Sequence, residues 1–177
     1  MPSSRTRPTR RTCLESSLAI ALCASLGALN TACATSRMGD AEVRLLDGQP
    51  CFSISAKEAA RGPTIRLQAV LISDTSTKPV DRVWSVMLDQ QRLPTLSPDS
   101  CVAYGQTPEG ATSKPTPVPE LQSGKVYQVH LNTRSSDSSD PTRGYVGKFC
   151  FMPDGANSRR LVPLKPGSRE WIDEVCR

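Results

Sequence analysis

The sequence predicts an all-β fold: a small antiparallel β-sandwich of the immunoglobulin-like kind, stapled by two disulfides and placed after an N-terminal signal peptide. Three observations lead to this prediction. Short segments alternate apolar and polar residues, with turn-forming residues between them. Fifteen prolines and eleven glycines interrupt the chain too often for long helices. No strand alternates with a long helical segment, as a parallel α/β fold would require.

Residues 1–32 predict a secretory signal peptide. Four arginines lie within the first eleven residues, and residues 16–29 carry no charge. A membrane-spanning helix needs about 20 apolar residues, so this run is short for a span. Residues 18–24 are apolar on every side, whereas a helix covering a soluble domain has a polar face. A basic start followed by a short apolar run therefore indicates export.

Two processing sites overlap at the end of this leader. "LNTAC" resembles a bacterial lipobox, in which Cys33 becomes diacylated; Ala32 and Thr31 match it, while Asn30 stands where an aliphatic residue is usual. Residues 33–40 would then be a lipidated tether, and residues 41–177 would form the domain, facing the periplasm from the cell envelope. The alternative is that "ACA" is a signal-peptidase site with cleavage before Thr35, which would give a soluble periplasmic protein.

The route of export has two readings as well. "TRRTCLE", residues 9–15, resembles a twin-arginine signal, and the other reading is an ordinary basic start of a general secretory signal.

The strands are expected in the following order. Residues 41–55 form two strands joined by a tight turn at Asp47-Gly48. Further strands follow at 64–73, 80–89, 101–105, 125–133 and 145–153, and residues 159–165 and 171–176 close the chain. Pro163 makes the segment at 159–165 an edge strand or breaks it. Between seven and nine short strands with turns between them are typical of a sandwich.

Two long polar segments are expected as loops, at 105–120 and 132–144. Either they are plain surface connections or they carry a binding surface, as long loops at the ends of a sandwich can. Tyr104 and Arg143 flank these loops and are the candidate partner-binding residues. Each can equally be an ordinary surface side chain.

Charge and motifs favour a binding protein over an enzyme. From Cys33 onward there are 18 Lys and Arg against 16 Asp and Glu, because four arginines and one glutamate belong to the leader. This small excess gives nucleic-acid binding little support. His130 is the only histidine, and no C-x-x-C, G-x-S-x-G, H-E-x-x-H, P-loop or dinucleotide motif occurs. We therefore expect no enzyme activity, no metal and no cofactor.

The cysteine count predicts two disulfides. Cys13 and Cys23 leave with the leader, and Cys33 is either lipidated or removed. Four cysteines remain, which are Cys51, Cys101, Cys150 and Cys176. An even number in an oxidising compartment indicates disulfides, and three connectivities are possible. Each bridge should stabilise the domain by roughly 3–4 kcal/mol.

One resemblance goes further. "VRLLDGQPCFSIS", followed about 50 residues later by "LSPDSCVAYG", resembles the periplasmic immunity lipoproteins associated with type VI secretion. Cys51, Phe52 and Cys101 carry this resemblance, which extends from Cys33 to Tyr104; Val102-Ala103 stands where that family has a proline-bearing turn.

The resemblance implies the pairing Cys51–Cys101, and with it Cys150–Cys176. It also implies a lipoprotein that binds and neutralises a protein toxin, with no cofactor. The alternative function is that of a structural or assembly lipoprotein in an envelope complex.

Overall fold

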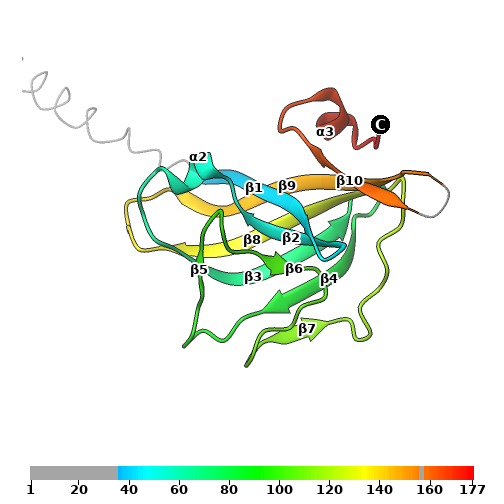
Figure 1. Cartoon of the computed structure of the whole chain (residues 1–177). Coiled ribbons are helices and arrows are strands. Elements are labelled where there is room, and N and C mark those ends of the chain that lie inside the picture. Colours follow the sequence, from blue (N-terminus) through cyan, green and yellow to red (C-terminus); the bar gives the residue numbers. More distant parts are fainter. Residues whose placement is uncertain (1–35, 156–157) are drawn as a thin grey trace, which may run out of the picture. The chain divides into compact units, whose positions relative to one another are not determined.

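The computed structural model describes residues 36–155 and 158–177. Nearly all of its regular structure is β (Figure 1). The strands are β1 (Arg37–Leu46), β2 (Gln49–Ile54), β3 (Ile65–Asp74), β4 (Asp81–Met87), β5 (Thr95–Leu96), β6 (Val102–Ala103), β7 (Thr112–Lys114), β8 (Val126–Ser135), β9 (Thr142–Pro153) and β10 (Arg159–Leu164). The helices are α2 (Ala56–Ala59) and α3 (Arg169–Asp173). No helix among the described residues is long and apolar enough to cross a membrane.

All ten strands belong to one hydrogen-bonded sheet. Its order is β6-β2-β1-β9-β8-β3-β4-β7, with β10 on β9 and β5 on β3. The pairs are antiparallel except β1 and β9, which run parallel. The prediction of a mainly β fold with two disulfides is confirmed. The purely antiparallel pairing is wrong at β1–β9, and two separate immunoglobulin-like sheets are not confirmed, because one sheet curls over a common core.

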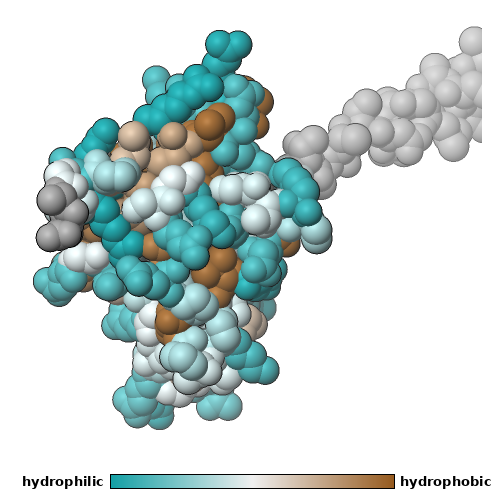
Figure 2. All heavy atoms as spheres, turned by 90° about the vertical axis from the view of Figure 1, so that its right-hand side faces the viewer, coloured by the Kyte–Doolittle hydropathy of each residue, from teal (hydrophilic) through white to brown (hydrophobic). Residues whose placement is uncertain are grey.

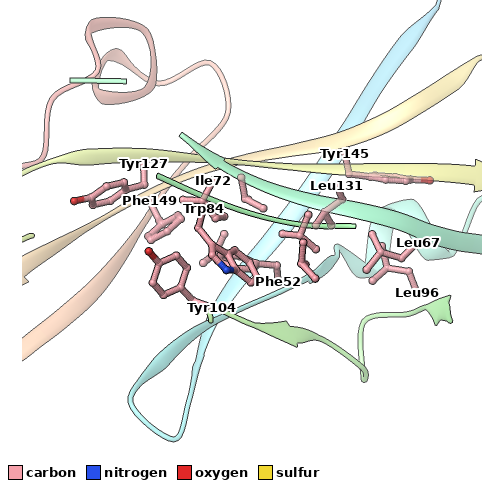
Figure 3. Close-up of a cluster of buried hydrophobic side chains, with 14 of the residues drawn as sticks. Phe52, Leu67, Ile72, Trp84, Leu96, Tyr104, Tyr127, Leu131, Tyr145 and Phe149 are labelled. Atoms are coloured by element: carbon pink, nitrogen blue, oxygen red, sulfur yellow. The ribbon is translucent and has the colours of Figure 1, made fainter. Parts of the chain in front are cut away.

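The curl brings β2 and the segment after β6 over the middle of the sheet (Figure 3). The rings of Phe52 and Phe149 lie 5.8 Å apart between centroids, and those of Trp84 and Tyr104 lie 5.2 Å apart. In β9, Phe149 and Phe151 belong to this core while Cys150 between them packs on the other side, since successive residues point to opposite faces of a sheet. Burial of each large apolar side chain contributes about 2–3 kcal/mol, so the inner face of the curled sheet is the main source of stability.

The C-terminal segment covers part of the outer face. Val126, Cys150 and Leu164 form a second buried cluster there, against which Trp171 and Cys176 pack. The Nζ of Lys148 donates to the Glu174 carboxylate at 2.8 Å and to the Trp171 carbonyl at 3.1 Å. A disulfide between Cys150 and Cys176 fixes the same segment covalently.

The folded domain begins earlier than expected. β1 starts at Arg37, so the last four residues of the predicted 33–40 tether are strand residues paired with β9. The start of β1 was not predicted from the sequence because Gly39 interrupts the alternation of apolar and polar residues. Gly39 is required there: a Cβ at this position would lie 2.4 Å from Cδ1 of Tyr145. The predicted signal peptide at 1–32, its twin-arginine motif and Cys33 lie outside the described residues.

The predicted loops and the last segment also differ from expectation. β8 and β9 extend into residues 132–144 and leave only a short turn between Ser135 and Thr142. The 105–120 segment contains β7. The final segment begins as the helix α3, because the hydroxyl of Ser168 caps it by accepting from the backbone N–H of Trp171.

Candidate partner-binding site

Tyr104, one of the two predicted partner-binding residues, belongs to the core. It is 8% exposed and stands edge-on to Trp84. Its hydroxyl donates to the Pro119 carbonyl at 2.8 Å, and burial raises the pKa of Tyr104 to about 12. Tyr104 therefore anchors the proline-rich segment to the core, and its side chain is not available as a surface contact.

Arg143, the other predicted residue, is exposed beside the β8–β9 turn. It lines a cavity of about 330 Å³ together with Arg134 and Asp140. Tyr104 lines a different cavity, next to Val118 and Pro119. The structure does not bring the two predicted residues into one site.

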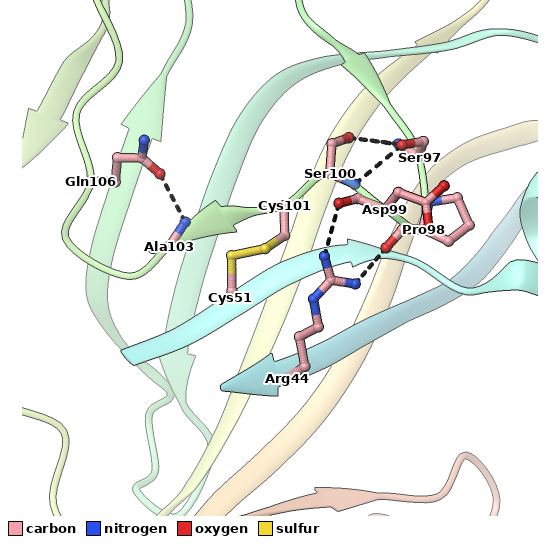
Figure 4. The surroundings of a disulfide bond; sticks show 9 residues. All are labelled: Arg44, Cys51, Ser97, Pro98, Asp99, Ser100, Cys101, Ala103 and Gln106. Atoms are coloured by element: carbon pink, nitrogen blue, oxygen red, sulfur yellow. Dashed lines mark hydrogen bonds between the residues drawn. A yellow bond between two sulfur atoms is a disulfide. The ribbon is translucent and has the colours of Figure 1, made fainter. Parts of the chain in front are cut away.

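Both predicted disulfides are confirmed. Cys51 and Cys101 are bonded, with their Cα atoms 5.5 Å apart, and Cys150 and Cys176 are bonded, with their Cα atoms 5.9 Å apart. Next to the first bridge, the guanidinium of Arg44 donates to the carbonyls of Pro98 and Asp99 (Figure 4). The β1–β2 hairpin therefore holds the turn before Cys101 by a covalent bond and by hydrogen bonds.

A cavity opens where two strands share one edge of β9. β1 pairs with β9 as far as Asp40 opposite Val146, and β10 takes over from Leu164 opposite Lys148. Gly147 lies at the changeover, and a Cβ there would lie 3.0 Å from the carbonyl oxygen of Ala41. Beyond this point β1 and β10 border a cavity of about 520 Å³, which we call the β1–β10 notch.

The β1 wall of the notch is a free strand edge. From Ala41 onward β1 pairs only with β2 among the described residues. The N–H of Ser55 donates to the carbonyl of Asp40. In an antiparallel pair the N–H and C=O of every second residue point toward the partner strand, so those of Asp40, Glu42 and Arg44 point toward β2. The N–H and C=O groups of the intervening residues therefore point away from β2: those of Ala41 face β9 beside Gly147, those of Val43 face the notch, and those of Leu45 lie on the same strand edge beyond it.

The β10 wall offers less for pairing. Pro163 stands in β10 and lines the notch. Proline has no N–H to donate, and in sheets it is confined mainly to edges. This part of the sequence prediction, an edge strand at Pro163, is confirmed. A chain segment entering the notch would find a strand edge to pair with on β1 but an interrupted one on β10.

Charges of both signs surround the notch. Asp40 and Glu42 come from β1, Lys57 from α2, and Lys165 follows β10. Lys148 also lines it but is only 8% exposed, and its ion pair with Glu174 holds the pKa of that carboxyl below its usual range, with Lys78 adding to the effect. Figure 2 shows the side of the molecule on which β10 lies: hydrophobic residues form limited patches, one near the top, among hydrophilic ones.

The polar groups of the notch are backbone groups and charged or engaged side chains. Ser55 is the lining residue with a hydroxyl group, and this hydroxyl accepts a hydrogen bond from the backbone N–H of Glu58 at 3.3 Å. His130 does not line it; burial lowers the pKa of His130, and the charge of Arg82 lowers it further. Within the described part of the chain, no group of three His, Cys, Asp or Glu residues is placed to hold a metal ion. A molecule entering the notch would therefore meet backbone N–H and C=O groups and the charged side chains at the rim.

Sequence reasoning did not find the notch. The hairpin at 41–55 and the edge position of Pro163 were both readable from the sequence. The sequence did not indicate that β1 and β10 both pair with the same edge of β9, because local residue patterns carry no information about which strands pair. No protein-family model matches the chain, and no similar curated protein or solved structure was found.

Proposed function

We propose that this protein is an envelope lipoprotein, facing the periplasm, that binds and neutralises a protein toxin, as the type VI immunity lipoproteins do. The observation that carries the proposal is the β1–β10 notch: a free strand edge beside a cavity, on a domain made rigid by two disulfides. In this proposal the curled sheet is the rigid scaffold, in place of the β-sandwich of the type VI immunity lipoproteins. A binding protein needs such a frame and a complementary surface, and it needs no catalytic residues.

The notch suggests how a partner would be held. An extended segment of the toxin would lie along β1 from Val43 to Leu45 and pair with the N–H and C=O groups that point away from β2, which is recognition by strand addition. Side chains of that segment would meet the mixed charges of Asp40, Glu42 and Lys57 at the rim. A toxin whose segment is held in this way would be blocked from its target by the bulk of the domain.

Co-expression tests this function. Each candidate effector encoded in the same genome would be directed to the periplasm of a sensitive host, with and without this protein. We expect one effector to become harmless when the protein is present, and protection to be lost when residues 1–32 are deleted. If no effector is neutralised, and capture from the envelope returns only a stable resident complex, the structural or assembly alternative replaces this proposal.

A matched pair of variants tests the strand edge. Leu45→Pro removes one N–H from the free edge of β1, beyond the notch, whereas Leu45→Ala keeps it. Leu45 lies opposite Pro50 in the β1–β2 ladder, so neither change removes a hydrogen bond to β2. One lost hydrogen bond, with its acceptor left unpaired, should weaken toxin binding about tenfold in the proline variant, as measured by calorimetry. Equal affinities of the two variants would refute strand addition.

The lipid anchor is a separate prediction. Cells fed a fatty-acid analogue should label the protein, and Cys33→Ser should abolish the label, because the thiol of Cys33 is the proposed attachment point. Mass measurement of the mature N-terminus gives the second readout. A soluble periplasmic protein beginning at Thr35 would establish the signal-peptidase alternative instead.

A further inference from the structure

The connection between the proposed anchor and the domain is short. β1 begins at Arg37, so only three residues, 34–36, separate Cys33 from the sheet. Four Cα–Cα steps extend at most about 14 Å. If Cys33 carries lipid, as the proposed function has it, the start of β1 must lie close to the bilayer surface. The parts of the domain around this point would then face the lipid headgroups.

The β8–β9 turn lies beside the start of β1. The N–H of Arg37 donates to the Pro141 carbonyl at 2.9 Å, and its guanidinium donates to Oγ1 of Thr142 at 3.0 Å. Figure 1 shows this turn and the start of β1 at the same end of the sheet, with α3 and β10 toward the other end.

Three arginines gather at this end. Arg134 and Arg143, at the two sides of the turn, line one cavity, and Arg66 lies directly opposite Arg134 in the β3–β8 ladder. All three are exposed, and none forms an ion pair with another described residue. We name Arg66, Arg134 and Arg143 the arginine cluster.

Two carboxylates nearby keep their negative charge but form no ion pair with the three arginines, because they accept hydrogen bonds within their own turn. Asp137 accepts from the N–H and hydroxyl of Ser139 at 2.8 and 2.7 Å, and Asp140 accepts from the N–H of Thr142 at 2.9 Å. Like charges directly opposite in a ladder, as at Arg66 and Arg134, destabilise a sheet. An anionic surface would offset this repulsion, and guanidinium groups bind phosphate oxygens in a bidentate manner.

We propose that the arginine cluster is a membrane-docking surface, which binds the phosphate headgroups of anionic lipids in the bilayer that carries the Cys33 anchor. The short tether places the cluster at the lipid surface, and its charge is complementary to that surface. β1 runs about 30 Å over its ten residues, so Leu45 lies near the end of the strand opposite the docked one. The notch is thereby presented to the periplasm.

Vesicle experiments on the mature lipidated protein test this inference. The probes are vesicles of phosphatidylcholine alone and of phosphatidylcholine mixed with phosphatidylglycerol. We expect amide hydrogen exchange in the β8–β9 turn to slow about tenfold on the anionic vesicles, because anionic headgroups attract arginines near the surface, and to recover at high salt. The β1–β2 turn at Asp47-Gly48 should exchange equally on both.

Charge-matched variants localise the effect. Arg66→Gln, Arg134→Gln and Arg143→Gln combined should abolish the slowing. Arg160→Gln, Arg169→Gln and Arg177→Gln combined remove the same charge from the C-terminal part and should leave it intact. Equal exchange on both kinds of vesicle, or equal loss in both triple variants, overturns the docking surface while leaving toxin neutralisation untouched. A mature protein that carries no lipid, seen by mass spectrometry, overturns both the anchor and this inference.

Discussion

Removal of both disulfides is expected to unfold the domain. Cys51–Cys101 closes a separation of 50 residues and Cys150–Cys176 one of 26. From the chain-entropy relation, the two disulfides should raise the free energy of unfolding by about 4 and about 3.5 kcal/mol, respectively. Their sum is comparable with the roughly 5–15 kcal/mol by which a domain of this kind is stable. The quadruple Cys→Ala protein should therefore show no cooperative urea transition, or one at a much lower urea concentration.

Single-bridge variants separate the two contributions. Cys51 and Cys150 are both fully buried, so alanine at either position leaves a comparable gap in packing. We expect the Cys51→Ala/Cys101→Ala protein to lose slightly more unfolding free energy than the Cys150→Ala/Cys176→Ala protein, in line with the loop lengths. Thiol titration of the unfolded, unreduced domain should give no free thiol. A quadruple variant that unfolds at the same urea concentration as the native domain would contradict the prediction.

The strands that the sequence predicts best are those with strict alternation. In β8, Tyr127, Val129 and Leu131 are buried while Gln128 and His130 are less so. This pattern could be predicted because successive side chains of a strand point to opposite faces. Burial of one face therefore appears in the sequence as alternating apolar and polar residues. The disulfides were predictable for another reason: an even cysteine count in an oxidising compartment restricts the possibilities to three.

Long-range pairing was not predictable in the same way. Arg37 pairs with Thr142 in the parallel β1–β9 contact, 105 residues away. Alternation tells which face of a strand is buried but not which strand lies beside it or in which direction that strand runs. The notch depends on this pairing, so it could not be found either. The burial of Tyr104 was not predictable for a similar reason, because the residue it packs against, Trp84, belongs to another strand, β4.

Glu58→Gln is expected to give the largest loss of stability from a single charged residue. Glu58 is 2% exposed, and its carboxylate binds the guanidiniums of Arg37 and, at 3.1 Å, Arg61. Removing one partner of a buried ion pair typically costs 3–5 kcal/mol. Because Arg37 and Arg61 retain some exposure to water, we expect about 3 kcal/mol for Glu58→Gln, at the lower end of that range.

Two controls separate the buried contact from surface charge. Arg61→Gln removes a half-exposed partner and should cost less than about 1 kcal/mol. Glu42→Gln removes a β1 carboxylate that forms no ion pair with another described residue, and it should change stability by less than about 0.5 kcal/mol. Urea denaturation of the three variants at neutral pH makes the comparison.

The pH dependence of unfolding gives a second readout for Glu58. Burial alone would raise the pKa of Glu58, but the hydrogen bond and charge of Arg37 outweigh it, so the pKa is lower in the folded domain than its ordinary value. A carboxylate of this kind stabilises the fold above its unfolded pKa, and the contribution is lost as pH falls through the folded pKa. The native domain should therefore lose stability on acidification below about pH 5 more steeply than Glu58→Gln. Parallel curves for the two proteins would show that the Arg37–Glu58 contact does not hold the start of β1 in place.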